Sequence, residues 1–218
     1  SDLLKTPLTS ISGYAELIET GIAKPEDTPG FARKIHVEAS RMIQLVNDIL
    51  QLSHLDNVSE TGAAPAMETV DLLDVARECV ERQKVNARHS YISLTYLGES
   101  APVTGSRVLL DELCQNLCDN AIRYNRPGGK VQIITACTRD GHCTLTVKDN
   151  GIGIPKEAQT SVFERFYRVD KSRSKATGGT GLGLAIVKHI ARIHNARIKL
   201  DSVVDEGTTI TVIFETAS

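Results

Sequence analysis

The 218-residue sequence has almost no excess charge, no long apolar run and no clustered cysteine pattern. Its formal net charge is -2, so we expect no general attraction to nucleic acid or to an anionic membrane. Apolar runs fall well short of the roughly 20 residues that a membrane span needs, and no signal-peptide pattern is present. We therefore expect a soluble chain that makes no membrane contact of its own and holds any phosphate-bearing ligand locally.

The five cysteines are odd in number and sparse, which favours a reducing compartment such as the cytoplasm. Cys114 and Cys118 stand four residues apart on a predicted helix, but no nearby His or Cys pair completes a metal site. We expect plain buried thiols, the usual state of free cysteines. The full set is Cys79, Cys114, Cys118, Cys137 and Cys143.

Hydrophobic residues make up 41% and charged residues 24% of the chain, so it can bury a real core. The length favours two unequal domains, and we find no internal repeat. The sequence begins abruptly, so we expect a longer parent protein, which leaves open an anchor at the inner face of the cell membrane.

Residues 1–57 are predicted to form two antiparallel helices. Apolar residues recur at spacings of three and four across 4–22 and again across 31–55, which keeps one apolar stripe on each helix. The Pro- and Gly-containing segment 24–30 separates them. A hairpin cannot bury both stripes alone, so homodimerisation into a four-helix bundle is the economical solution, and packing on the second domain of the same chain is the alternative.

A linker at 58–68 leads to a second domain at 69–218, where helical and strand patterns mix. Helices are expected at 71–88, 109–124 and 182–194, and strands at 91–97, 131–138, 143–149, 197–203 and 208–214. The predicted fold class is therefore α+β, an antiparallel helical hairpin followed by an α/β sandwich with helices on one face of a mixed sheet.

Four short motifs follow one another in the second domain. They are Asn116-Leu-Cys-Asp-Asn120-Ala-Ile-Arg123-Tyr124, Asp149-Asn-Gly151-Ile-Gly153-Ile154, Gly179-Thr180-Gly181-Leu182-Gly183-Leu184 and Glu206-Gly207-Thr208. A single Gly-x-Gly can be only a turn, and polar residues can be only the solvated face of a helix. Neither explanation accounts easily for the ordered set, which also has the aromatic and basic run 163–168 between the two glycine motifs.

The chemistry of each motif suits the binding of a ligand. Asn116, Asn120 and Arg123 share one helical face and can converge on one ligand, and Asn oxygens suit Mg²⁺. Asp149 ends a strand just before two glycines, where the backbone can pass close to a ligand. The glycines at 179–183 precede a helix, so bare backbone N–H groups can cradle phosphates.

The four motifs resemble the Asn box, the two glycine boxes and the final Gly-Thr element of the GHKL ATPase superfamily. The resemblance implies ATP and Mg²⁺, with Asn120 as the metal ligand, Arg123 as a phosphate contact, Tyr124 as a wall against the adenine and Asp149 as the partner of the adenine amino group. Lys175 stands in the implied lid, where a solvated basic loop is the alternative. The other implied nucleotide contacts are Asn116, Gly151, Gly153, Ile154, Arg168, Gly179, Thr180, Gly181, Leu182, Gly183, Leu184 and Thr208.

The hairpin points to one branch of this superfamily. Hydrolysing members carry a glutamate where Asn116 stands here, so transfer is favoured over hydrolysis. The segment Leu4-Lys5-Thr6-Pro7-Leu8-Thr9-Ser10-Ile11 resembles the residues that follow the phosphoacceptor in sensor histidine kinases, and 38–50 resembles their second helix. The resemblance to these kinases thus covers essentially the whole chain.

The chain departs from that family at its start. In these kinases a histidine that accepts phosphate and a glutamate that assists proton removal precede the Leu-Lys-Thr-Pro segment. Here Asp2 holds the acceptor position and Leu3 the acid position, so the phosphoacceptor histidine is absent and autophosphorylation is expected to be impaired. Thr6, which helps dephosphorylate the partner in such kinases, remains. His36 and His54 lie where the family has no acceptor.

The leading hypothesis is the cytoplasmic core of a sensor histidine kinase, with Asn116 and Thr6 in catalytic roles. It would bind Mg-ATP, pass the γ-phosphate to the hairpin and relay it to the aspartate of a response-regulator receiver domain. The alternative is a phosphotransfer-deficient dimeric ATP-binding scaffold. A hydrolase of the same superfamily is third, because the glutamate is missing.

Overall fold

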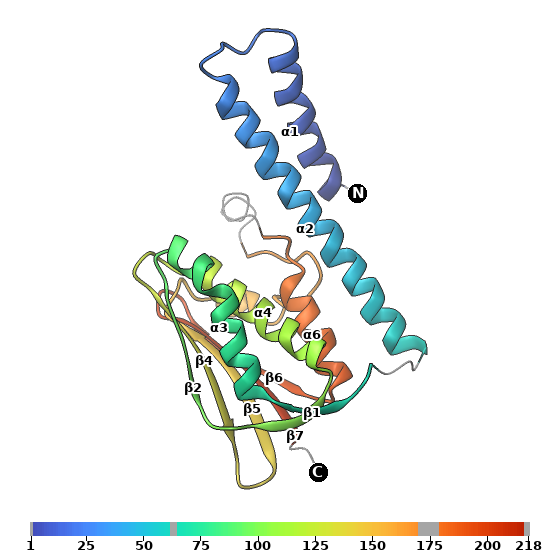
Figure 1. Cartoon of the computed structure of the whole chain (residues 1–218), viewed down its shortest axis with the longest axis vertical. Coiled ribbons are helices and arrows are strands. Elements are labelled where there is room, and N and C mark those ends of the chain that lie inside the picture. Colours follow the sequence, from blue (N-terminus) through green and yellow to red (C-terminus); the bar gives the residue numbers. More distant parts are fainter. Residues whose placement is uncertain (1, 62–64, 170–178, 216–218) are drawn as a thin grey trace.

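The computed structural model describes residues 2–61, 65–169 and 179–215, and the side chains of 4–57 within the first segment. Helices α1 (Asp2–Glu19) and α2 (Thr28–Thr61) form an antiparallel hairpin, and α2 continues down one side of the second domain (Figure 1). Near the hairpin loop, Tyr14 stacks on Phe31 with ring centroids 5.5 Å apart. The two predicted helices are confirmed, although α2 extends four residues past the expected end at 57.

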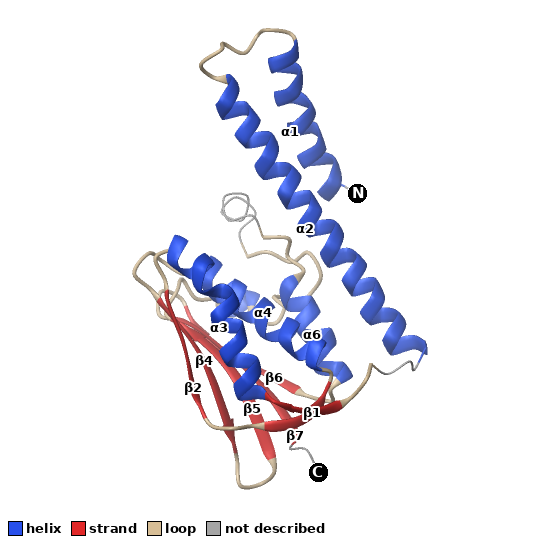
Figure 2. Cartoon of the chain, in the orientation of Figure 1, coloured by secondary structure: helices blue, strands red, loops and turns tan. Residues whose placement is uncertain are grey.

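The second domain is a five-stranded sheet covered on one face by three helices, as expected (Figure 2). The strand order is β2-β4-β5-β7-β6, with β2 and β4 parallel and all other neighbours antiparallel. The helices are α3 (Leu72–His89), α4 (Arg107–Arg123) and α6 (Gly183–Ile193). The strands are β2 (Ser93–Gly98), β4 (Lys130–Cys137), β5 (His142–Asp149), β6 (Arg197–Val203) and β7 (Gly207–Glu215), and a short 3-10 helix spans Lys156–Ala158.

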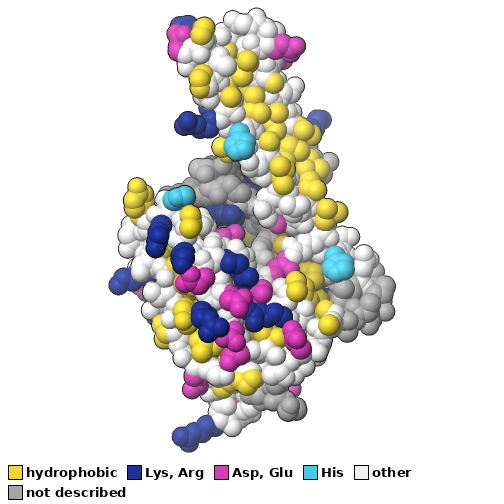
Figure 3. All heavy atoms as spheres, in the orientation of Figure 1, with side chains coloured by type: hydrophobic (Ala, Val, Ile, Leu, Met, Phe, Trp, Pro, Cys, Tyr) yellow, Lys and Arg dark blue, Asp and Glu magenta, His cyan; other side chains and the backbone are white. Residues whose placement is uncertain are grey.

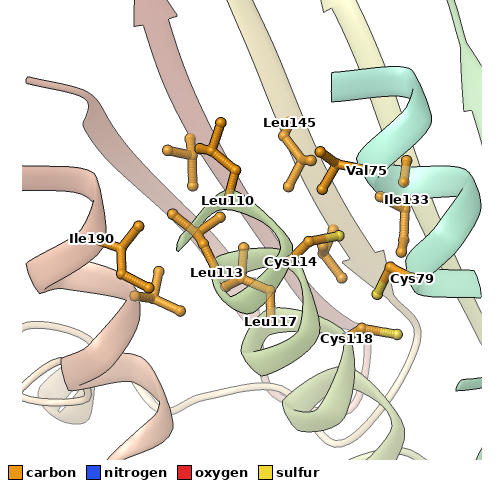
Figure 4. Close-up of a cluster of buried hydrophobic side chains, with 14 of the residues drawn as sticks. Val75, Cys79, Leu110, Leu113, Cys114, Leu117, Cys118, Ile133, Leu145 and Ile190 are labelled. Carbon is orange, nitrogen blue, oxygen red and sulfur yellow. The ribbon is translucent and has the colours of Figure 1, made fainter. Parts of the chain in front are cut away.

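The core lies between α4 and the sheet. Leu113 and Leu117 of α4, Leu145 of β5, Ile133 of β4 and Ile190 of α6 belong to one cluster of buried side chains (Figure 4). All five side chains are essentially buried. The strands alternate buried and partly exposed residues because successive side chains point to opposite faces of a sheet.

A small two-stranded sheet was not expected from the sequence. Strand β1 (Glu68–Asp71) pairs antiparallel with β3 (Pro102–Gly105), so part of the expected linker is a strand. Asp71 fixes this corner, since its Oδ1 accepts the N–H groups of Leu73 and Ala101 at 2.9 and 2.8 Å and thereby caps α3. Strands of four residues are too short to show a period in the sequence.

The expectation that all the cysteines are free thiols is wrong for one pair. Cys137 and Cys143 form a disulfide between directly opposed positions of β4 and β5, with Cα atoms 4.1 Å apart. The tight turn at 138–141 brings the two cysteines together. The predicted strands on either side of this turn already imply that the two residues are close, but no disulfide was predicted. The other three cysteines are free and buried. Because Cys137 and Cys143 are oxidised, these two residues do not support the predicted reducing compartment.

Helix α2 uses its surface in two ways. Leu52 and Leu55 are buried, and α2 packs alongside α6, so the alternative in which the hairpin packs on its own second domain holds for this end. Ile43 and Leu50 are each 63% exposed, and apolar side chains gather along the hairpin (Figure 3). No helix in the described part of the chain combines the length and apolar character that a bilayer crossing requires.

Candidate functional site

Asp149 joins two of the four motifs at the end of β5. Its Oδ1 accepts the N–H of Gly151 at 2.8 Å and the N–H of Thr208 at 3.2 Å. Burial raises the pKa of the Asp149 carboxyl, and these two backbone hydrogen bonds oppose that rise. The first glycine motif and the final Gly-Thr element therefore meet at one partly buried acid.

A layer of hydrogen bonds that the sequence did not reveal supports this acid. Ser202 Oγ on β6 accepts the Ile154 N–H at 2.8 Å and donates to the Gly207 carbonyl at 2.9 Å. Thr208 Oγ1 lies 2.9 Å from the same oxygen and must donate to it, because a hydroxyl has one proton. Gln159 Nε2 donates to the carbonyls of Ile154 and Ser202. Only the position of Ser202 opposite Thr208 in the closing hairpin hinted at such a role.

The first glycine motif passes against neighbouring backbone. A Cβ on Gly151 would lie 2.4 Å from the Tyr124 carbonyl oxygen, and one on Gly153 would lie 2.1 Å from that of Val203. Gly153 also has a φ of +69°, a conformation that L side chains rarely adopt. The N–H of Ile152 donates to the Tyr124 carbonyl at 3.0 Å, which ties this motif to the end of α4.

Helix α4 meets the second glycine motif along its polar face. Asn116 Oδ1 lies 3.1 Å from the position of a Cβ on Gly183, and Asn116 Nδ2 donates to the Glu112 carbonyl at 3.0 Å. Two turns later, Arg123 Nη1 and the Tyr124 hydroxyl lie 3.3 and 3.1 Å from the position of a Cβ on Gly179. The structure thus brings the Asn motif beside the glycines, as the sequence predicts.

Asn120 lies between these two contacts on the same helix face. Its side chain is partly exposed and makes no hydrogen bond to any residue in the described segments. An amide oxygen in that state is available to a hard cation such as Mg²⁺. The residues present therefore fit the metal that the resemblance implies.

The run before the second glycine motif folds back onto it. The Phe166 N–H donates to the Gly181 carbonyl at 2.9 Å, and Phe166 has a φ of +64°, which is a strained conformation for a bulky residue. Gly181 itself has a φ of +75°. Arg168 follows in a partly buried position, where burial and then the positive charge of Arg41 on α2 lower the pKa of its guanidinium.

The second glycine motif also touches the hairpin, which the sequence did not predict. Thr180 Oγ1 donates to Asp48 Oδ2 of α2 at 2.5 Å, and Asp48 is only 7% exposed. The Leu182 side chain is buried and the Leu184 side chain packs against the core, so both side chains help to anchor the motif. Lys175 lies outside the described residues.

A carboxyl of α4 faces the same contact. Burial and the nearby charge of Asp48 raise the pKa of Glu112 to about 7. Glu112 lies one helical turn before Asn116, and the charge that acts on it comes from Asp48 of the hairpin. No local pattern in the sequence links Glu112 to Asp48, because 64 positions separate the two residues.

The hairpin places the predicted acceptor position at the first residue of α1. Asp2 begins the helix, and Thr6 lies exposed one turn later. One domain therefore contains the carboxylate at the end of β5, the polar face of α4 and the glycine turn that enters α6. The helical hairpin packs beside this domain (Figure 1).

Two family models match the chain. Residues 105–218 match the model described as histidine kinase-, DNA gyrase B- and HSP90-like ATPase, and residues 1–58 match the His kinase A (phospho-acceptor) domain. The second match covers most of the hairpin, and the first covers the part of the sheet domain from the end of β3 onward.

Curated relatives are similar over nearly the whole chain. The sensor-like histidine kinase SenX3 of Mycolicibacterium smegmatis is 42% identical over 214 residues, which are 96% of this chain and 54% of that protein. The sensor protein kinase WalK of Staphylococcus haemolyticus is 38% identical over 95% of this chain and 34% of that protein. The chain thus spans about half the length of the first relative and about a third of the second.

Solved structures agree in fold. The Acinetobacter baumannii histidine kinase AdeS matches 99% of this chain and 98% of its own with a TM-score of 0.73 at 23% identity. The histidine kinase ThkA, solved in complex with the response regulator protein TrrA, matches 98% of this chain and 59% of its own with a TM-score of 0.74 at 21% identity. The mycobacterial sensor histidine kinase MprB is 32% identical over 69% of this chain and 97% of its own, with a TM-score of 0.60. With both domain models matched in order and relatives of this identity, the chain belongs to the sensor histidine kinase family.

Proposed function

We propose that this chain is the catalytic core of a sensor histidine kinase that binds Mg-ATP and serves phosphoryl transfer to the hairpin. The observation that carries the proposal is the meeting of all four motifs at one site, where Asp149 links two of them and α4 links the other two. The core comprises the hairpin, whose second helix ends at Thr61, and an ATP-binding domain whose first strand begins at Glu68.

Each predicted nucleotide-binding residue is assigned either to the adenine or to the phosphates of the nucleotide. Asp149 accepts from the adenine amino group, with Tyr124, Gly151, Gly153, Ile154 and Thr208 around the base. Asn116, Asn120, Arg123, Arg168 and the segment 179–184 take the phosphate side, as Lys175 does from the lid. Mg²⁺, held by Asn120, supplies charge neutralisation between the phosphates when bound.

Transfer would break the bond between the γ-phosphorus and the bridging oxygen, form a bond to the acceptor and release ADP. In an intact kinase the acceptor is a histidine nitrogen that loses its proton to a neighbouring glutamate carboxylate, which acts as the base. Asp2 is shorter than histidine and Leu3 cannot take a proton, so autophosphorylation of this chain is impaired. Asp2 and Leu3 also favour the second candidate, a dimeric ATP-binding scaffold without phosphotransfer. Thr6 would lack its usual neighbours, histidine and glutamate, in any dephosphorylation.

Two protein partners follow from the hairpin. The exposed apolar side chains on α2 support a homodimer with a four-helix bundle, and the complex of ThkA with TrrA supports a response-regulator receiver domain as the second partner. We place the core in the cytoplasm, with a parent protein at the inner face of the membrane.

Incubation with ATP labelled at the γ-phosphate tests this function. We expect Mg-dependent ATP binding with little or no label on the parent chain. The double change Asp2→His with Leu3→Glu should restore label that is lost in acid and stable in base, as a phosphohistidine is. The same double variant carrying Asn120→Ala is the control and should remain unlabelled.

Three outcomes would contradict parts of this account. Absence of ATP binding would overturn the kinase-core proposal. Strong acid-labile label on the parent chain would overturn the impaired acceptor. ATP binding without label in the double variant would favour the scaffold.

A further inference from the structure

Two polar contacts hold α2 against the described part of the second domain, where α2 runs beside α6 (Figure 1). In the first, both carboxylate oxygens of Asp56 accept from Arg165 Nη2 at 2.8 Å, and His189 Nε2 lies 3.4 Å from one of them. In the second, two helical turns earlier, Asp48 Oδ2 accepts the Thr180 hydroxyl at 2.5 Å. The second contact lies within a motif that is proposed to bind the nucleotide.

The proton of the Thr180 hydroxyl is already in use in this arrangement. A hydroxyl group has one proton, and Thr180 donates it to Asp48. The hydroxyl oxygen in turn accepts the N–H of Leu182 at 3.3 Å, which holds the side chain in place. While α2 is docked in this way, the Thr180 hydroxyl cannot donate to a phosphate oxygen.

Asp48 also brings a carboxylate to the second glycine motif. It is only 7% exposed, and the donors to its two oxygens, the Thr180 hydroxyl and the Gln44 amide, are neutral, so neither donor cancels its charge. The same charge acts on α4, where burial and then Asp48 raise the pKa of Glu112 to about 7. A phosphate that entered the motif would meet this carboxylate at close range, and like charges repel strongly where little water screens them.

We propose that the contact between Asp48 and Thr180 restrains nucleotide binding, so that the docked hairpin and the phosphates of ATP compete for the second glycine motif. The inference rests on the proposed function, which places the phosphates at 179–184. The docked α2 lowers the affinity for ATP, and bound ATP weakens the docking of α2 by the same factor, because coupling between two equilibria is reciprocal. A movement that draws Asp48 away from the motif therefore raises the affinity for ATP without altering any nucleotide contact.

Calorimetric titration of the full chain with Mg²⁺ and a non-hydrolysable ATP analogue tests this restraint. Asp48→Ala removes both the charge and the acceptor, so it should raise the affinity about fivefold or more, the lower end of the usual coupling between sites. Asp48→Asn keeps an acceptor for Thr180 but removes the charge, so it should give a smaller rise. Asp27→Asn, at an exposed position just before α2, is the matched control and should bind the analogue as the parent does.

Amide hydrogen exchange in the parent chain gives a second measurement. Saturation with the analogue should speed exchange in the α2 peptide that contains Asp48, Leu52 and Leu55, because this end of the helix loses its buried contacts when it undocks. Unchanged or slower exchange in that peptide would overturn the proposal, because docking and nucleotide binding would then not oppose each other.

The titrations separate this inference from the proposed function. If neither the parent nor Asp48→Ala binds the analogue, the proposed function fails and the restraint fails with it. If the parent binds the analogue and a folded Asp48→Ala binds it equally or more weakly, only the restraint is overturned, because Asp48 then has a structural role at most. Tighter binding by Asp48→Ala, or binding by that variant alone, supports both. Thermal unfolding checks the fold, and Asp48→Asn takes its place in this comparison if Asp48→Ala does not fold.

Discussion

Asp149 and Thr208 stand 59 residues apart in the sequence, yet the Asp149 carboxylate accepts the Thr208 N–H at 3.2 Å. The same oxygen accepts the Gly151 N–H, so one acid holds the first glycine motif against the closing hairpin. Those two bonds use Oδ1 alone, so Oδ2 is the oxygen that the proposed function assigns to an adenine amino group. One oxygen thus stabilises the fold, and the other is proposed to bind the ligand. A substitution at Asp149 can therefore separate the two roles.

Asp149→Asn should weaken adenine nucleotide binding about tenfold to a hundredfold with little loss of stability. The amide oxygen can still accept from Gly151 and Thr208, but the remaining amide nitrogen presents a donor where the adenine needs an acceptor. A fluorescent ATP analogue measures the affinity and thermal unfolding measures the stability. Asp201→Asn, at an exposed position of β6, should change neither. Unaltered nucleotide affinity in Asp149→Asn would remove this residue from the site.

Gly183→Ala should lower nucleotide affinity several-fold while the domain stays folded. The added methyl would lie 3.1 Å from Asn116 Oδ1, so the Asn116 side chain must shift, although alanine itself favours the helix. Gly13→Ala is the control, because its Cβ would meet no atom within 4 Å. That control should keep full affinity and gain up to about 1 kcal/mol of stability. Equal affinity in both variants would contradict the proposed contact.

Glu112→Gln should stabilise the chain above neutral pH and not in acid. The pKa of Glu112 in the folded state is about 7, above its ordinary 4.5, so its contribution is full below pH 4.5 and lost as pH rises through 7. The parent should therefore become less stable than the variant across that window, by at most about 3 kcal/mol. Denaturant unfolding at pH 4, 6 and 8 measures the difference. A difference independent of pH, or one matched by the exposed Glu157→Gln, would contradict this account.

Reduction of the bond between Cys137 and Cys143 should destabilise the second domain by about 2 kcal/mol, the cost expected for opening so short a loop. Thermal unfolding with and without a reductant measures it, and the double change to serine should remove the effect of the reductant. Thiol titration of the denatured, unreduced chain should find three free thiols. Five reactive thiols would show that the disulfide does not form.

Leu50→Lys and Ile43→Lys should each shift the chain from dimer to monomer. Both side chains are 63% exposed on α2, and a lysine there would place a charge within an apolar dimer seam. Sedimentation velocity measures the assembly state. Val108→Lys replaces an even more exposed apolar residue, 74% exposed on α4, and should leave the dimer intact. A parent chain that sediments as a monomer at all concentrations would contradict the dimer.

Local patterns in the sequence were sufficient for most of the fold. The stripes of α1 and α2, the alternation of β4 and β5 and the spacing of Asn116, Asn120 and Arg123 all depend on residues near one another, and period alone determines which face they share. The four motifs could be identified for the same reason, because each is a short continuous segment in which the glycines or polar residues stand near one another. The short strands β1 and β3 were missed because four residues carry too little pattern.

Only the tertiary structure decided which distant residues meet. Ser202 can hydrogen-bond Thr208 because the register of β6 and β7 places the two residues opposite each other. Cys137 lies opposite Cys143 because of the register of β4 and β5. The contact of Asp48 with Thr180, the burial that raises the pKa of Glu112 and the nearness of Arg41 to Arg168 all depend on how α2 docks on the second domain. Docking angle and register come from the packing of whole surfaces, which no local period encodes. The sequence determined the motifs that make up the proposed site, and the fold determined that the hairpin contacts one of them through Asp48 and Thr180.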